Sequence, residues 1–266
     1  MENQAPDPDL HHPERSETLQ AAASPLGRIL TAGRGVDWWA RGWTLFAKSP
    51  WVWIAITLTW IVTMAVLNRV PFLGPIAVTL LYPLLFGGVL VGTRELDRGG
   101  HLRFDHLFAC CNKRSLPLLV LALILLAAWC VLWLLAGSVL VGIAGMGTLG
   151  TLLAGDDAIL GIAALSALGF GAMVTLLVTA LVSVPLFMAG WFAPPLVLFR
   201  GDEPLAALKT SLFAAARNTA PFLIYGLIGL ALMVAATIPF GLGWLILMPV
   251  SAASLYAAYE DIFGTG

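Results

Sequence analysis

The sequence has 266 residues, of which 59% are hydrophobic and only 11% are charged. A soluble domain is about 45–50% apolar and about 25% charged, so this composition excludes an ordinary water-soluble protein and favours one that is surrounded by lipid. The 14 basic and 15 acidic residues nearly cancel, to a net charge of −1, and give no reason to expect a nucleic-acid partner.

The first 35 residues are polar and contain four prolines, with no long apolar stretch. A segment of this kind cannot bury enough apolar surface to fold by itself. We therefore predict that residues 1–35 form a disordered cytoplasmic tail and that residues 36–266 form a transmembrane helical domain.

An amphipathic helix is expected directly after the tail. One face carries apolar residues at helical spacing: Val36, Trp39, Ala40, Trp43, Phe46 and Ala47. The opposite face carries polar residues: Asp37, Arg41, Thr44 and Lys48. Tryptophan favours the boundary between water and hydrocarbon, so Trp39, Trp43 and Trp51 are expected to anchor the chain there. A helix of this kind that simply packs on the bundle is the alternative.

Apolar runs divide the rest of the chain. They cover residues 51–67, 72–92, 116–140, 158–199, 220–237 and 244–259. A span needs about 20 residues to cross a hydrocarbon core of about 30 Å. The fourth run is about twice that long and contains prolines, which bend or break helices, so it is either one bent helix or two spans.

The distribution of the basic residues favours six spans. With six, 13 of the 14 Lys and Arg residues lie on one side of the membrane, and Arg69 alone lies on the other. Splitting the fourth run would move Arg200, Lys209 and Arg217 to the other side. Because positive charge collects on the cytoplasmic side, we predict six spans with both termini in the cytoplasm.

A short pattern occurs three times before the odd-numbered runs. Leu-Phe-Ala begins at Leu45, Leu107 and Leu212, and one or two basic residues and a proline follow each time. Further prolines recur in the outer turns, as Pro71-Phe72 and Pro239-Phe240, and inside the even-numbered runs, as Pro83, Pro185 and Pro249. The pattern predicts an all-α bundle of three repeated units, each a cytoplasmic amphipathic helix plus a transmembrane hairpin. Chance recurrence in a chain rich in Leu and Ala is the alternative.

Residue types that carry chemistry are sparse. The predicted spans contain no Asp, Glu, Lys, Arg or His, which argues against proton relay and against transport of charged substrates. No nucleophile-elbow or zinc-protease motif occurs, so we expect no enzyme. His106 and Cys110 supply two of the four ligands that structural zinc needs, and no metal or cofactor is expected. Glu260 and Asp261 are expected to cap the last span in contact with water.

Two functions remain. The first is a structural or interaction protein of the envelope, with the lipid bilayer as its partner and further membrane proteins or a second copy of the chain as candidates. The second is a transporter or channel for a neutral or lipid-like solute. It predicts a polar-lined cavity at a helix break, for which Pro185, Trp191, Pro194 and Pro195 are the candidate residues. We favour the first function.

Five motifs resemble those of an uncharacterised family of proteobacterial six-span inner-membrane proteins. They are Gly33-Arg34-Gly35-x-x-Trp38, Gly42-Trp43-x-Leu45-Phe46-x-x-x-Pro50, Trp191-Phe192-Ala193-Pro194-Pro195, Asn218-x-x-Pro221-Phe222 and Tyr256-x-Ala258-Tyr259-x-Asp261-Ile262-Phe263. The resemblance covers about residues 32–263 and implies a location in the bacterial inner membrane. That family has no established activity, so the resemblance implies no catalytic or binding residue.

Overall fold

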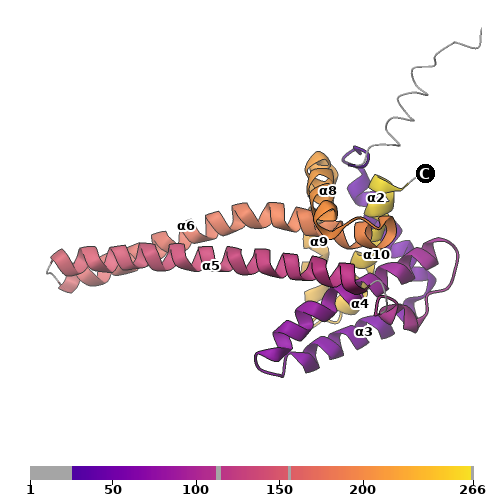
Figure 1. Cartoon of the computed structure of the whole chain (residues 1–266), viewed down its shortest axis with the longest axis horizontal. Coiled ribbons are helices and arrows are strands. Elements are labelled where there is room, and N and C mark those ends of the chain that lie inside the picture. Colours follow the sequence, from indigo (N-terminus) through magenta and orange to yellow (C-terminus); the bar gives the residue numbers. More distant parts are fainter. Residues whose placement is uncertain (1–25, 112–114, 155–156, 265–266) are drawn as a thin grey trace, which may run out of the picture. The chain divides into compact units, whose positions relative to one another are not determined.

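The computed structural model describes residues 26–111, 115–154 and 157–264. All of the regular structure in these ranges is helical, and no strand occurs among them (Figure 1). The helices are α2 (Arg34–Lys48), α3 (Pro50–Leu67), α4 (Leu73–Asp97), η1 (Phe104–Phe108), α5 (Ser115–Ala154), α6 (Asp157–Trp191), α7 (Ala193–Pro195), η2 (Leu196–Arg200), α8 (Pro204–Arg217), α9 (Thr219–Thr237) and α10 (Trp244–Phe263). The predicted all-α class is confirmed.

Among the described residues, five helical stretches are long and apolar enough to cross a membrane. They are Pro50–Leu67, Leu73–Asp97, Leu116–Gly147, Leu165–Arg200 and Thr219–Thr237. The long fourth run forms a single helical path in which α6 is followed by the short α7 and η2. The sixth predicted span coincides with α10, which is helical but is not among the five.

The described residues form two compact units, where the sequence predicted one domain. The terminal unit contains residues 26–57, 93–102 and 213–264, and the central unit contains the described residues of 58–92 and 103–212. Residues 26–35, which belong to the predicted tail, make specific contacts with the terminal unit. The prediction for residues 1–25 lies outside the described residues.

In the terminal unit, α2 packs against α9 and α10. Its buried face consists of Gly35, Trp38, Trp39, Gly42, Leu45 and Phe46. The apolar face that the sequence predicted to meet lipid is divided between two environments: Trp39 and Phe46 are buried, whereas Val36 and Trp43 are 51% and 54% exposed.

Two glycines on α2 explain which side of this helix is buried. A Cβ atom at Gly42 would lie 2.7 Å from the carbonyl oxygen of Val250 and 2.8 Å from Cβ of Ser254, both on α10. A Cβ atom at Gly35 would collide with the carbonyl oxygen of Pro221 on α9. Because glycine lets two helix backbones approach closely, the face of α2 that carries these glycines is the one that packs.

The central unit contains the pair of long helices α5 and α6, which lie side by side (Figure 1). They have 40 and 35 residues, so they extend about 60 and 50 Å at a rise of about 1.5 Å per residue. Small residues bring them together, because a Cβ atom at Gly171 would lie 3.1 Å from the Ile143 side chain. Figure 1 shows α6 running back along α5.

Candidate functional site

Three of the sequence motifs meet in the terminal unit, at the start of α2 and the end of α10. The guanidinium group of Arg34 donates two hydrogen bonds to the Asp261 carboxylate, from Nε to Oδ2 at 2.7 Å and from Nη2 to Oδ1 at 2.6 Å. The indole Nε1 of Trp38 donates a third, to Oδ2 of Asp261 at 2.9 Å. A two-pronged pair of this kind fixes orientation as well as distance.

The environment of this pair keeps both groups charged. Burial raises the pKa of Asp261, but the hydrogen bonds from Arg34 and Trp38 and the guanidinium charge outweigh burial, so the pKa is lowered overall. The hydrogen bond to Asp261 likewise raises the pKa of Arg34. The Asp261 side chain is 14% exposed. It therefore does not act as the solvated cap that the sequence predicted.

The Asn218 side chain ties the segment before α2 to the same place. Its Oδ1 accepts a hydrogen bond from the Leu30 amide at 2.8 Å, and its Nδ2 donates to the Arg28 carbonyl at 3.0 Å. The Arg28 amide donates to the carbonyl of Ile262 at 2.9 Å. Asn218 is 1% exposed, so its amide finds the partners that a buried polar group needs. We use the name terminal clasp for two sets of contacts: those of Arg34 and Trp38 with Asp261, and those of Asn218 with the backbone of residues 28–30.

Aromatic rings extend the clasp towards the middle of α9 and α10. Trp39 stacks on Tyr225 with ring centroids 4.8 Å apart, and its Nε1 donates to the Tyr225 carbonyl at 3.0 Å. The Tyr225 hydroxyl lies 2.7 Å from the Ser254 hydroxyl, within hydrogen-bonding distance. Trp38 packs on Phe222 with centroids 5.3 Å apart. The rings and polar atoms together join all three helices.

The predicted interfacial anchors occupy different environments. Trp39 is 8% exposed and packs on Tyr225, while its role as an anchor stays a prediction. The close packing that Gly35 and Gly42 permit is the reason for this burial, since it turns this side of α2 inward. Trp43 and Trp51 are exposed, and their anchoring role stays a prediction.

In the central unit, α6 ends at the predicted Trp191-Phe192-Ala193-Pro194-Pro195 segment. The Ser211 hydroxyl of α8 accepts a hydrogen bond from the Phe192 amide at 2.9 Å and donates to the Met188 carbonyl at 2.7 Å. It is thus inserted between two groups that an unbroken helix would pair directly. Pro194 and Pro195 form most of α7 and are buried. The break is stabilised by a side chain that the sequence analysis did not single out.

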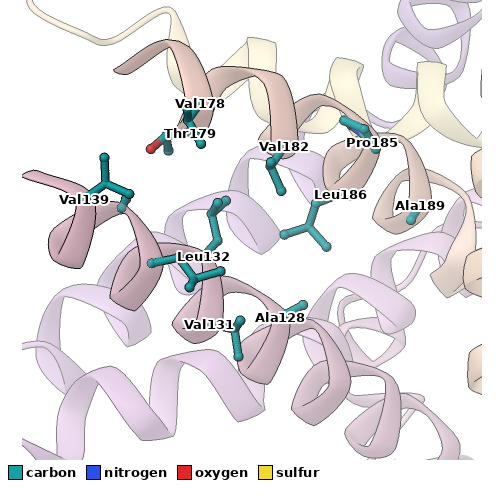
Figure 2. Close-up of a pocket in the computed structure, with 12 residues that line it drawn as sticks. Ala128, Val131, Leu132, Val139, Val178, Thr179, Val182, Pro185, Leu186 and Ala189 are labelled. Atoms are coloured by element: carbon teal, nitrogen blue, oxygen red, sulfur yellow. The ribbon is translucent and has the colours of Figure 1, made fainter. Parts of the chain in front are cut away.

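A cavity of about 390 Å³ lies between α5 and α6 beside Pro185 (Figure 2). Its lining comes from both helices: Ala128, Val131, Leu132, Leu135, Ala136 and Val139 of α5, and Val178, Thr179, Val182, Pro185, Leu186 and Ala189 of α6. Figure 2 shows aliphatic side chains along both helices, and Thr179 contributes the single hydroxyl of the lining. Trp191, Pro194 and Pro195 do not line this cavity. The polar lining expected for a solute path is not found here.

The arrangement around His106 favours a structural role for this residue. Its Nδ1 accepts a hydrogen bond from the Arg103 amide at 3.1 Å. Cys110 is buried, with its sulfur 3.0 Å from the position that a Cβ atom would take on Gly87. Within the described ranges, no group of three or more His, Cys, Asp or Glu residues is placed to hold a metal ion.

Comparison with known proteins found one informative relative. A probable inner membrane protein of Burkholderia thailandensis is 27% identical over 259 residues, which cover 88% of this chain and 93% of the relative. No family model matches the chain, and no solved structure matches it. The apolar helices and this relative together support a multi-pass location in the inner membrane.

Proposed function

We propose that the chain is a structural protein of the bacterial inner membrane that crosses it six times, with both termini in the cytoplasm, and that it organises lipid or partner proteins without catalysing a reaction. The observation that carries the proposal is the terminal clasp. It joins the residues before the first span to the last residues of α10, and it employs the polar groups of the sequence motifs as structural contacts.

The clasp bears directly on the number of crossings. Arg34 precedes α3, and Asp261 lies at the end of α10, yet their side chains are hydrogen-bonded to each other. Two groups in such contact lie on the same side of a membrane, so the chain between them crosses an even number of times. Five apolar stretches lie between them, so an even number of crossings supports α10 as the proposed sixth.

The composition of α10 fits a span that is covered by protein. Twelve of its 20 residues are buried, among them Ser254, Tyr256 and Tyr259. A helix that faces other helices can carry hydroxyl groups, because these find hydrogen-bond partners there, as Ser254 does with Tyr225. These residues, together with Glu260 and Asp261 at the end of the helix, lower its mean hydropathy, and α10 is not among the five apolar stretches.

The helices of the second, fourth and sixth apolar runs, which are α4, α6 and α10, share a pattern that supports three repeated units. In α4, α6 and α10, a proline is followed four and five positions later by two small residues: Gly87 and Gly88, Ala189 and Gly190, and Ala253 and Ser254. Beside each pair of small residues lies an amphipathic segment that belongs to another of the three repeated units.

Each of these contacts lies within one compact unit. A Cβ atom at Gly88 would meet the backbone of His106 and Leu107 in η1. Ser211 of α8 bonds to the α6 backbone on either side of Ala189 and Gly190. Gly42 of α2 packs on Ser254 of α10. The second helix of each hairpin therefore packs on the amphipathic segment of the next repeated unit: α4 on η1 and α6 on α8. The last of them, α10, packs on α2 of the first repeated unit.

A transport assay tests the proposed role against the alternative. Purified protein in sealed vesicles is expected to pass neutral solutes such as glycerol, and to move fluorescent phospholipids between leaflets, no faster than protein-free vesicles do. Flux or lipid movement well above that background, abolished by Pro185→Leu in a variant that remains folded, would establish the transporter instead.

A further inference from the structure

Two phenylalanines in the turns between spans have a backbone conformation that is rare outside glycine. Phe72 has φ of 60° and Phe240 has φ of 53°, and among the described residues every other positive φ belongs to a glycine. Each phenylalanine directly follows a proline, in Pro71-Phe72 and Pro239-Phe240. A bulky residue in this left-handed region is strained, and strain that recurs in two separate turns indicates a role for the side chain.

Both rings point away from the protein. Phe72 is 89% exposed and Phe240 is fully exposed. The turns are also tightly closed: the Gly74 amide donates to the Val70 carbonyl at 2.9 Å, and the Gly241 amide donates to the Thr237 carbonyl at 3.2 Å. These turns bury neither ring, so packing within the protein does not account for the presence of phenylalanine.

The lengths of the preceding helices place both turns at the edge of the hydrocarbon. The helix α3 has 18 residues and α9 has 19, so each extends about 27–29 Å at about 1.5 Å per residue. The hydrocarbon core is about 30 Å thick. Phe72 follows the last residue of α3 by five positions and Phe240 follows the last residue of α9 by three. The turns that contain them therefore lie where headgroups meet acyl chains, a depth that aromatic rings favour.

We propose that Phe72 and Phe240 are membrane anchors that insert into the phospholipid surface of the outer leaflet. The location in the outer leaflet rests on the six-span topology proposed above, whereas insertion at the interface rests on the turn geometry and on the lengths of α3 and α9. The left-handed backbone directs each ring out of its turn, and lipid then covers the apolar surface that the turn leaves open. Lipid is the occupant common to two turns that lie in different compact units.

Depth measurement tests the insertion. In a variant with Cys110→Ala, Cys111→Ser and Cys130→Ala, a nitroxide label is attached to a cysteine introduced at Phe72 or Phe240, and the protein is placed in phosphatidylethanolamine–phosphatidylglycerol vesicles. Collision rates with oxygen and with a water-soluble nickel chelate report depth. Labels at Arg69 and at Ile61, in the middle of α3, are the references for water and for hydrocarbon.

The labels at positions 72 and 240 are expected at a depth between those of the two references. Labels as open to the nickel chelate as the one at Arg69 would overturn the inference. Because Cys110 is buried, the substitutions could disturb folding. A second measurement therefore uses the chain with its cysteines intact and places photoreactive benzoylphenylalanine at position 72 or 240. Crosslinking to phospholipid is expected, and crosslinking without any phospholipid adduct would also overturn the inference.

The side of the membrane is measured separately. A membrane-impermeant maleimide applied to intact spheroplasts is expected to label Arg69→Cys in the same cysteine-free background. Labelling only after the membrane is opened would contradict the topology and the outer-leaflet location. Interfacial depth with failed outside labelling would thus reject the proposed topology, whereas outside labelling with an aqueous depth would reject the anchors.

Discussion

The helix α10 of the terminal unit and the helix α6 of the central unit are both expected to cross the membrane, yet they differ in how much of their surface other parts of the protein cover. Twelve residues of α10 are buried against protein, whereas the apolar stretch of α6 has no buried residue in its most apolar window. The less apolar helix is thus the one that is packed. High apolarity marks surface that faces lipid, and moderate apolarity with matched hydroxyl and aromatic groups marks surface that faces other helices.

The two regions therefore differ in what a substitution would remove. In the terminal unit, polar atoms such as the Tyr225 hydroxyl and the Trp39 indole N–H depend on specific partners, and losing a partner leaves a buried group unsatisfied. Along the α5–α6 pair, aliphatic side chains face lipid or each other, and lipid can replace much of a lost contact. Five substitution experiments test this contrast, from the largest expected effect to the smallest.

The largest effect is expected for Gly42→Val. The new side chain would collide with the backbone of α10, where a Cβ atom already lies 2.7 Å from the Val250 carbonyl oxygen, and would push α2 away. We expect a loss of about 3 kcal/mol of unfolding free energy, measured by thermal or denaturant unfolding in detergent. The control is Gly137→Val in α5, where nothing lies within 4 Å, and it is expected to cost about 0.5 kcal/mol or less. Equal losses would contradict the contrast.

The next effect is the coupling between Arg34 and Asp261. Unfolding of Arg34→Ala, Asp261→Ala and the double variant gives their interaction energy by a double-mutant cycle. We expect about 1–2 kcal/mol, because the hydrogen bonds are charge-assisted but the Arg34 side chain is 42% exposed and partly screened by water. Arg103 and Asp105 form an exposed pair that serves as the control, with an expected coupling of about 0.5 kcal/mol or less.

The same pair predicts a dependence on pH. Because the pKa of Asp261 is lowered in the folded state, its carboxylate stabilises the fold above the unfolded-state value of about 4, and this contribution is lost as the pH falls through the folded-state pKa. The difference in melting temperature between the natural protein and Asp261→Asn is expected to be constant at pH 5–8 and to shrink below about pH 4. A difference that grows in acid would refute the assignment.

A smaller effect is expected where Ser211 bridges the break in α6. Ser211→Ala removes the hydroxyl that bonds to the Phe192 amide and the Met188 carbonyl, and we expect a loss of about 1 kcal/mol. Ser211→Thr retains the hydroxyl and is the matched control, whose stability separates loss of the bond from loss of volume. If alanine has no effect, the helix has re-formed its direct bond and the hydroxyl is not needed.

The smallest effect is expected on the α5 side of the cavity. Val131 is 55% exposed and lines the cavity, so Val131→Ala removes a contact that lipid can replace. We expect a change within about 0.5 kcal/mol in bilayers. Leu45→Ala, which truncates a side chain buried in the terminal unit, is expected to cost about 2–4 kcal/mol under the same conditions.

The sequence predicted the helical class and the helical runs well, because composition and apolar length directly reflect a lipid environment. Hydrophobic spacing was less informative about which face of a helix is buried. On α2 it placed Val36, Trp39, Trp43 and Phe46 on one lipid-facing surface and did not separate the buried Trp39 and Phe46 from the exposed Val36 and Trp43. It gave no weight to Gly35 and Gly42, since glycine has no side chain to count. The close approach of three backbones is a property of the packed helices, and no single helix displays it.

The terminal clasp was missed for a related reason. Asp261 was interpreted as a solvated cap because nothing near it in sequence bonds to it, while its partners Arg34 and Trp38 lie more than 220 positions earlier. One clue was present in the sequence, because Arg34, Trp38, Asn218 and Asp261 all belong to the motifs that carried the family resemblance. Motifs without catalytic chemistry, at opposite ends of a chain, were a reason to look for contacts between them.

The most direct test of the central claim is the side of the membrane on which the end of α10 lies. Fusions of a cytoplasm-active fluorescent protein and of a periplasm-active phosphatase are made after Arg69, Asp157 and Gly266. Phosphatase activity is expected after Arg69 and Asp157, and fluorescence is expected after Gly266. Phosphatase activity after Gly266, together with phosphatase activity after Arg69 and Asp157, would contradict six crossings and a cytoplasmic end of α10, on which the proposal rests.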